Sequence, residues 1–238
     1  MADAGSDSKN LKTLLQARQP LPAGLGTALG EFLRALHAWG ATAPPVRTVL
    51  AQNTPAAKTW TWATYGRLAE TLELFPQVLG AAATTLAAVA EAPPLPRAQR
   101  TLVHGDYWCG NVLLGADGKV TVVDWEMARE GFAWEDLAQM CAELYLPVHF
   151  GGHRDGATVL DAFLRGYGAV SDEEMAARAV VHFGVHLVVW PCRVSGWGDA
   201  EQIEECMRVG LEFIERGWAK DWGWVSESVL KNIYDGPL

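Results

Sequence analysis

A chain of 238 residues is long enough for one large or two small domains with a sizeable core. Half of the residues are apolar and a fifth are charged, as in ordinary soluble globular proteins. The net charge of −9 counts against nucleic-acid binding, because a phosphate backbone requires clustered Lys and Arg and none occur here. The same charge permits a cationic small-molecule substrate.

The cysteine pattern and the N-terminal sequence are indicators of the cellular compartment of a protein. No CxxC pair occurs, which is typical of a reduced, intracellular protein. The first ten residues are polar and contain no apolar signal core. The longest apolar run, 180–190, is broken by two His and a Gly and is too short to span a bilayer. The sequence therefore predicts a cytoplasmic protein without a membrane segment.

The first hundred residues have the patterns of helices. Apolar residues at helical spacing predict a helix over 27–39 that ends at Gly40. A second helix is predicted over 60–74, interrupted at Pro76, and an Ala-rich helix over 78–90. The helical stretch then ends at a Pro-Pro pair, 93–94, which introduces a short extended segment.

Two β-prone runs, 112–114 and 120–123, flank the turn signal Asp117-Gly118 and predict an antiparallel hairpin. After the hairpin the patterns are helical almost to the end of the chain. The helices predicted there cover 134–146, 157–167, 172–190 and 200–216, with a short one near the C-terminus. The fold class predicted is mainly α with one small β-hairpin.

Three polar residues surround this hairpin. Asn111 immediately precedes its first strand and Asp124 follows its second, so both lie at the open end, and Asp106 is on the loop that leads there. Amide and carboxylate oxygens suit a hard divalent cation such as Mg²⁺. A carboxylate on the loop can accept or orient the proton of an attacking hydroxyl. This is the division of roles found in phosphoryl transfer.

The motif HGDxxxxN at 104–111, followed by DWE at 124–126, resembles the aminoglycoside phosphotransferase and choline kinase superfamily, whose fold is that of the protein kinases. The resemblance implies that Asp106 is the catalytic base, supported by His104 in the same loop. It also implies that Asn111 and Asp124 bind Mg²⁺ and, through it, ATP. Asp136 resembles the aspartate with which the family braces this loop.

The stretch LGEFLRALH at 29–37 resembles the first helix of the family's C-terminal lobe. The family's nucleotide-binding N-lobe would precede it, yet nothing before it resembles a glycine-rich loop on strands. Lys9 and Lys12 have the wrong context to replace the strand lysine. We therefore expect a hinge-like segment, 1–25, and a kinase-like C-lobe, 26–238, with a catalytic loop at 104–111 and a metal hairpin at 111–126.

These features predict ATP- and Mg²⁺-dependent phosphorylation of a small-molecule hydroxyl, with activity weakened by the missing lobe. Three explanations stay open: a truncated enzyme, an N-lobe supplied by a partner, or a repurposed pocket. In the last case the chain is a metabolite-binding pseudokinase, or a lyase or cyclase in which Asp106 or His104 acts as acid–base group. The surface that the N-lobe covers in the family would be exposed in this chain, which predicts a homodimer or a partner complex.

Aromatic and acidic residues suggest the substrate. Aromatic faces beside carboxylates suit an amine or a quaternary ammonium, and a flat apolar metabolite is the alternative. The candidate pocket residues are Trp108, Trp125, Glu126, Glu143, Trp60, Trp62, Trp190 and Trp197. His182 and His186 have the spacing of a helical zinc pair but lack a third ligand, and Cys109 lacks an activating cation, so all three are interpreted as structural.

Overall fold

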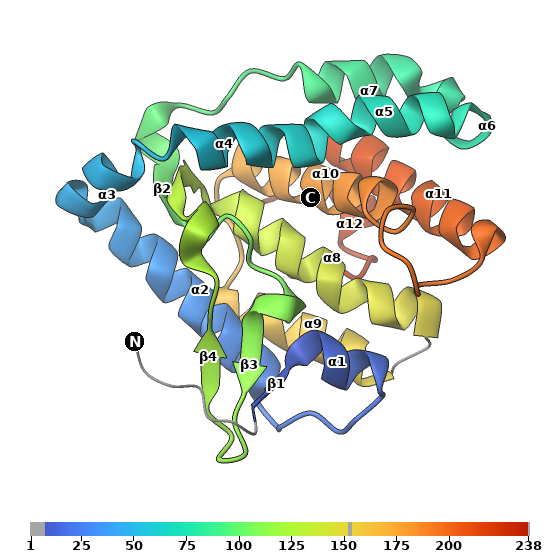
Figure 1. Cartoon of the computed structure of the whole chain (residues 1–238). Helices are drawn as coiled ribbons and strands as arrows, with labels where there is room; N and C mark the ends of the chain where they lie inside the picture. The colour runs from blue at the N-terminus through green and yellow to red at the C-terminus, as the bar shows by residue number, and fades with distance from the viewer. Residues whose placement is uncertain (1–7, 152–153, 238) are drawn as a thin grey trace.

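The computed structural model describes residues 8–151 and 154–237. The described chain is mainly helical with two small antiparallel sheets (Figure 1), which confirms the predicted fold class. The hinge-like residues at the N-terminus, 1–7, lie outside the described residues. The division into 1–25 and 26–238 stays a prediction.

Twelve α-helices are assigned in the described residues. In chain order they are α1 Leu11–Gln16, α2 Leu25–Thr42, α3 Pro44–Leu50, α4 Thr54–Thr61, α5 Arg67–Leu74, α6 Pro76–Leu79, α7 Ala83–Ala90, α8 Ala133–Gly151, α9 Arg154–Tyr167, α10 Glu173–Val189, α11 Ala200–Trp218 and α12 Trp222–Val225. The predicted helix over 60–74 in fact begins at Thr54, where Asn53 caps α4 through Ala56 N at 3.3 Å. A π-helical turn, η1 Trp62–Gly66, joins α4 to α5.

The predicted hairpin is present. Strand β3 Val112–Leu114 pairs antiparallel with β4 Val120–Val122, and β1 Lys9–Asn10 adds a third strand on β3. The prediction of a single hairpin with only helices after it is wrong. β2 Arg100–Val103 pairs with β5 Arg129–Phe132 in a second, two-stranded sheet. Each of these strands is too short for a reliable alternating pattern.

Helix α8 is the centre of the fold. It runs across the molecule between α9 on one side and α10 on the other (Figure 1), and most of its residues are buried. Helices α2 and α9 pack closely because Gly30 and Gly166 leave no side chain between them: a Cβ on Gly30 would lie 2.1 Å from Phe163 O. Near its C-terminal end α2 packs against β2, where a Cβ on Gly40 would lie 2.5 Å from Leu102 N.

Helices α4, α5 and α7 lie across the top of Figure 1 and cover α10. A small apolar core seals this layer: Leu68 and Leu86 from the cover pack with Val181 and Val185 of α10. Among the described helices, no single one is long and apolar enough to cross a membrane. One bent pair, Thr54–Leu74 with Pro76–Ala90, meets the criteria of length and composition only.

Candidate active site

The carboxylate of Asp106 is held on both oxygens. Gln139 of α8 donates its Nε2 to Oδ1 at 2.9 Å, and Asn111 donates its Nδ2 to Oδ2 at 3.0 Å and to the backbone oxygen of Asp106 at 3.0 Å. Burial raises the pKa of Asp106, and the hydrogen bond from Gln139 partly opposes this rise. The side chain is therefore fixed in orientation and more basic than an exposed aspartate.

Asp136 braces the start of the same loop. Its two oxygens accept the backbone N–H groups of His104 at 2.7 Å and Gly105 at 2.8 Å, and His37 Nε2 lies 3.3 Å from Oδ2. Burial alone would raise the pKa of Asp136, but the hydrogen bonds from His37 and Gly105 hold it below its ordinary value. This geometry agrees with the bracing role predicted for Asp136.

His104 bridges the loop and the hairpin. Its Nε2 donates to Val123 O at 3.0 Å, and its Nδ1 accepts the Asp106 N–H at 3.3 Å. In this arrangement Nε2 is the donor and Nδ1 the acceptor. The Trp125 ring covers the imidazole, with 4.5 Å between the ring centroids. His104 therefore sets the distance between the catalytic loop and the end of β4, and its ring nitrogens are both occupied.

Asn111 and Asp124 flank the open end of the hairpin, although β4 ends at Val122, one residue earlier than the predicted run 120–123. Val123 N donates to Asn111 O at 3.0 Å, so Val123 closes the ladder and Asp124 follows it in the left-handed region, at φ 65°. Asp124 is exposed, and its negative charge contributes to the raised pKa of Asp106. The left-handed backbone turns the chain away from the strand direction at this point.

These residues fit a hard divalent cation. Asn111 donates hydrogen bonds from Nδ2 to Asp106, and its Oδ1 accepts no hydrogen bond within the described residues. The Asp124 carboxylate likewise has no hydrogen-bond donor there. Such a small number of oxygen ligands suits Mg²⁺, because this ion keeps several bound waters and also binds phosphate oxygens of the substrate. Within 8–151 and 154–237, no group of three His, Cys, Asp or Glu could hold a metal.

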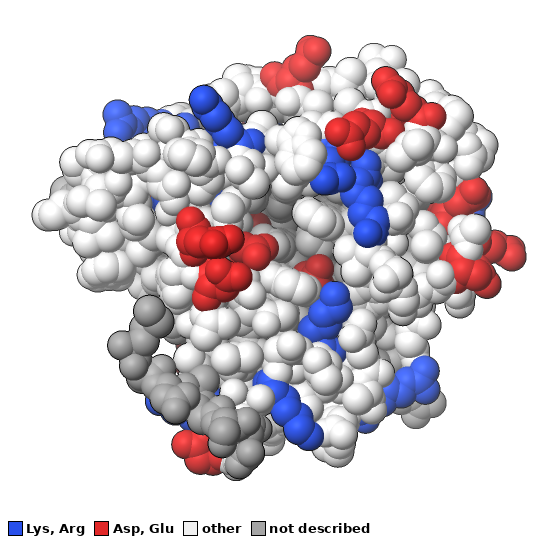
Figure 2. Space-filling model, viewed as in Figure 1, with Lys and Arg blue, Asp and Glu red and all other residues white. Residues whose placement is uncertain are grey.

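Three of the candidate pocket residues lie beside the catalytic loop. Trp125 contacts His104, and the exposed Glu126 follows it. Trp108 lies under the ammonium group of Lys12, with 4.8 Å from Nζ to the ring centroid, and Lys12 also reaches Trp197 at 5.5 Å. Figure 2 shows acidic side chains gathered beside a hollow on this face, over the segment that follows β4.

Glu143 lies one helical turn beyond Gln139 on α8, so both side chains share one face of the helix. Its Oε1 lies 2.9 Å from His186 Nε2, while its Oε2 is buried without a hydrogen-bond partner. The Trp190 ring is 6.0 Å from the His186 ring. Glu143 and Trp190, predicted as pocket residues, are therefore brought together through His186.

The structure separates Trp60 and Trp62 from this group. Trp60 belongs to an aromatic cluster with Tyr65, Trp134 and His182, with ring centroids 5.2–5.9 Å apart from its own. Trp62 is 53% exposed, with the Arg67 guanidinium 4.2 Å from its ring centroid. Neither residue contacts the catalytic loop through an interaction among the described residues.

Cys109 is buried in the catalytic loop, and burial raises the pKa of its thiol.

Sequence reasoning missed two residues of the site, Gln139 and His37. Gln139 lies three residues after Asp136, and therefore one turn farther along the same helix face. That spacing is the signal by which it could have been found. His37 ends the motif 29–37, but its contact with Asp136 depends on how α2 packs against β2.

The catalytic loop, its brace and the polar hairpin end agree with the comparison with known families. The family model described as "Phosphotransferase enzyme family" matches residues 7–180. The chain belongs to this phosphotransferase family. The predicted resemblance to aminoglycoside phosphotransferases and choline kinases is thereby confirmed, and homologues in this family are small-molecule phosphotransferases.

Three similar proteins illustrate the family. Phosphotransferase FrzJ of Cladobotryum sp is 25% identical over 229 residues, which cover 90% of this chain and 58% of FrzJ. The 4-hydroxytryptamine kinase of Psilocybe cyanescens is 31% identical over 121 residues, 48% of this chain and 33% of that enzyme. A choline/ethanolamine kinase family protein from Mesorhizobium loti shares the fold, with a TM-score of 0.50, 16% identity and coverage of 90% and 71%. The chain spans less than two thirds of the length of the first two relatives.

Proposed function

We propose that this chain carries the catalytic base and the metal-binding end of an ATP- and Mg²⁺-dependent phosphotransferase that acts on a hydroxyl group of a small molecule. The observation that carries the proposal is the fixed carboxylate of Asp106, hydrogen-bonded by Gln139 and Asn111 and adjacent to the charge of Asp124. Burial raises the pKa of this carboxylate, and a buried carboxylate with a shifted pKa is typical of a group that transfers a proton.

In this mechanism Asp106 accepts the proton of the substrate hydroxyl as the hydroxyl oxygen attacks the γ-phosphorus of ATP, the bond from that phosphorus to the bridging oxygen breaks, and ADP leaves. Each Asp106 oxygen accepts one hydrogen bond and keeps a lone pair for the substrate. Asn111 Oδ1 and the Asp124 carboxylate would hold Mg²⁺, which when bound neutralises phosphate charge. His104 and Asp136 position the loop and take no part in proton transfer.

We further propose that the substrate carries an amine. The unpartnered Oε2 of Glu143 lies within the fold, where an unpaired carboxylate oxygen is costly, and an ammonium group would satisfy it. The aromatic ring of Trp190 beside His186 suits the same cation. The relative named 4-hydroxytryptamine kinase supports a hydroxylated amine as the substrate class.

ATP with Mg²⁺ should stabilise the protein, and the free energy gained tests the metal site. Ligand at a hundred times its dissociation constant contributes about 2.7 kcal/mol, or roughly 5–11 °C in melting temperature for a chain of this size. Asp124→Ala should abolish this shift, and Asp106→Asn should keep it while losing phosphoryl transfer. Asp117→Ala in the hairpin turn is the matched control and should behave as the wild type.

The outcome that contradicts the proposal is an equal shift in wild type and Asp124→Ala, or no shift at any ATP concentration. A shift with an organic amine alone, unaffected by nucleotide, would favour the repurposed pocket. The substrate class is tested by calorimetric titration with 4-hydroxytryptamine. Glu143→Gln should weaken binding by about tenfold or more, as expected for a buried charge-assisted contact, whereas exposed Glu126→Gln should not.

A further inference from the structure

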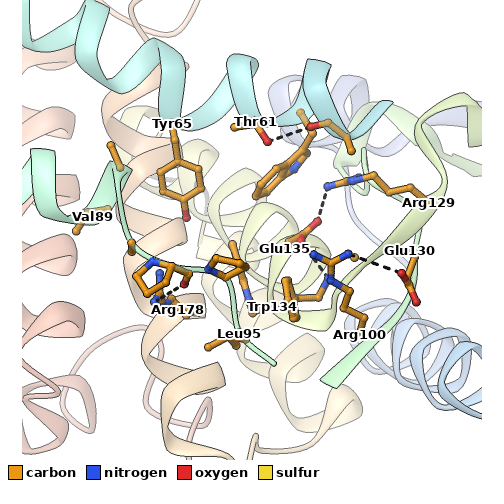
Figure 3. Close-up of a pocket in the computed structure, with 18 residues that line it drawn as sticks. Thr61, Tyr65, Val89, Leu95, Arg100, Arg129, Glu130, Trp134, Glu135 and Arg178 are labelled. Carbon is orange, nitrogen blue, oxygen red and sulfur yellow. Dashed lines mark hydrogen bonds and ion pairs between the residues drawn. The ribbon is translucent and has the colours of Figure 1, made fainter. Parts of the chain in front are cut away.

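A cavity lies beneath α4, apart from the catalytic loop (Figure 3). Its volume is about 340 Å³, within the size range of small-molecule sites. Its walls come from α4 and η1, from the end of α7 and the linker 91–96, from β5, and from the start of α8. Neither the residues of the loop 104–111 nor Asp124 line it. An occupant of this cavity would therefore not touch Asp106.

The charges around the cavity are unequal. The carboxylate of Glu130 forms ion pairs with three guanidinium groups: Arg47 at 2.9 Å, Arg97 at 3.6 Å and Arg100 at 3.7 Å. Arg47 and Arg97 lie outside the cavity. Its own lining carries three guanidinium groups, of Arg100, Arg129 and Arg178, and two carboxylates, of Glu130 and Glu135, in a protein whose net charge is −9. The other carboxylate in the wall, Glu135, is already paired with Arg129. The excess of positive charge at this wall favours an anionic ligand.

Arg100 is the cation with unused donors. At 3.7 Å its contact with Glu130 is too long for a hydrogen bond, and it donates none within the described residues. Its Nε is buried without a partner, while the side chain as a whole is 34% exposed. The guanidinium therefore presents N–H groups that an oxygen anion entering the cavity can reach. Figure 3 shows Arg100 and Glu130 side by side at one end of the cavity.

Aromatic rings form much of the remaining wall. The Arg100 guanidinium lies 5.2 Å from the Phe132 ring centroid, and the Phe132 and Trp134 rings are almost parallel, at 9°. Trp60 of α4 and Tyr65 of η1 also line the cavity. Arg178 donates to Pro93 O at 3.2 Å and so ties the covering linker to α10. Flat aromatic surfaces next to a guanidinium suit a planar ring that bears a carboxylate.

We propose that this cavity binds a small aromatic carboxylate, with the ring against Phe132 and Trp60 and the carboxylate on Arg100. This binding site is independent of the phosphotransferase activity and would be retained whether or not the chain binds ATP.

Calorimetric titration of the whole chain with a matched pair of ligands tests the site. Indole-3-acetate carries the carboxylate, and indole-3-acetamide has the same shape without the charge. We expect the acetate to bind at least about tenfold more tightly, the factor that corresponds to one charge-assisted hydrogen bond, and to weaken as salt is raised. Arg100→Gln should remove this preference, and Arg208→Gln on the exposed face of α11 should leave it unchanged.

A second variant keeps all charges and fills the space. Ala57→Phe, on the α4 wall, should abolish binding of both ligands, which also covers the case in which Arg100→Gln does not fold. Asp106→Asn should have no effect on either affinity. Absence of binding up to the solubility of both ligands overturns the proposal. So does equal affinity for acetate and amide, or loss of binding in Asp106→Asn, which would place the ligand in the catalytic site.

Discussion

Replacing Asp136 by Asn would remove one of the two acceptors that hold the catalytic loop. The amide keeps one oxygen but turns an NH₂ group towards either His104 N–H or Gly105 N–H, which are now 2.7 and 2.8 Å from a carboxylate oxygen. Asp136 is fully buried, so water cannot replace the lost acceptor. One orphaned buried donor costs about 1–3 kcal/mol, and a charge-assisted bond is worth about 1.5–3 kcal/mol. We expect a loss of about 3 kcal/mol.

Urea unfolding followed by circular dichroism measures this loss, with Asp117→Asn as control. Asp117 accepts Lys119 N at 3.0 Å in an exposed turn, so its variant should lose under about 1 kcal/mol. The pH dependence gives a second check. The folded pKa of Asp136 is below its ordinary 3.8, so its stabilisation is complete above pH 3.8 and is lost as the pH falls through the folded pKa. An Asp136→Asn loss equal to that of the control would refute the bracing role.

Two further predictions concern stability. Burial and nearby positive charge lower the pKa of His182 from 6.5 to about 3, so the unfolded chain binds its proton first and stability falls as pH drops below 6.5. At pH 5 the wild type should have lost about 2 kcal/mol of its free energy of unfolding through this group, and His182→Phe should not show this loss. If the free energies of unfolding of both proteins change in parallel with pH, the prediction is wrong. Gly184→Ala should cost about 1–3 kcal/mol, because its Cβ would lie 2.4 Å from Gly210 O between α10 and α11. Gly80→Ala, with open space around its Cβ, should be neutral or slightly stabilising, and equal melting temperatures for the two variants would contradict the packing argument.

The sequence predicted the parts of the fold that depend on local pattern. The helix over 27–39 and the hairpin around Asp117-Gly118 follow from spacing and turn chemistry, and both are present. The β2–β5 pairing was missed because it joins segments nearly thirty residues apart whose strands are four residues long. Nothing local in Arg129–Phe132 distinguishes a strand from a loop, since its partner decides its conformation.

The candidate site shows the same division. The sequence predicted that Asp106 lies on the loop that leads to the hairpin end at Asn111, and the hydrogen bond between their side chains agrees with this prediction. The contact of Glu143 with His186 joins α8 to α10 across 43 residues. The sequence singled out Glu143 as a pocket candidate and interpreted His186 as structural. That pair could be found only once the packing of these helices was known.

The three polar residues of α8 explain why one helix organises the site. Asp136, Gln139 and Glu143 follow each other at spacings of three and four, which places them on one face of the helix. The first two contact the catalytic loop directly, at Gly105 N and Asp106 Oδ1. Glu143 lies on the same face, but its Oε1 contacts His186 Nε2 and its Oε2 has no hydrogen-bond partner within the described residues. An unpaired carboxylate oxygen inside the fold is costly, so the amine hypothesis rests on the buried Glu143 and not on the exposed Glu126.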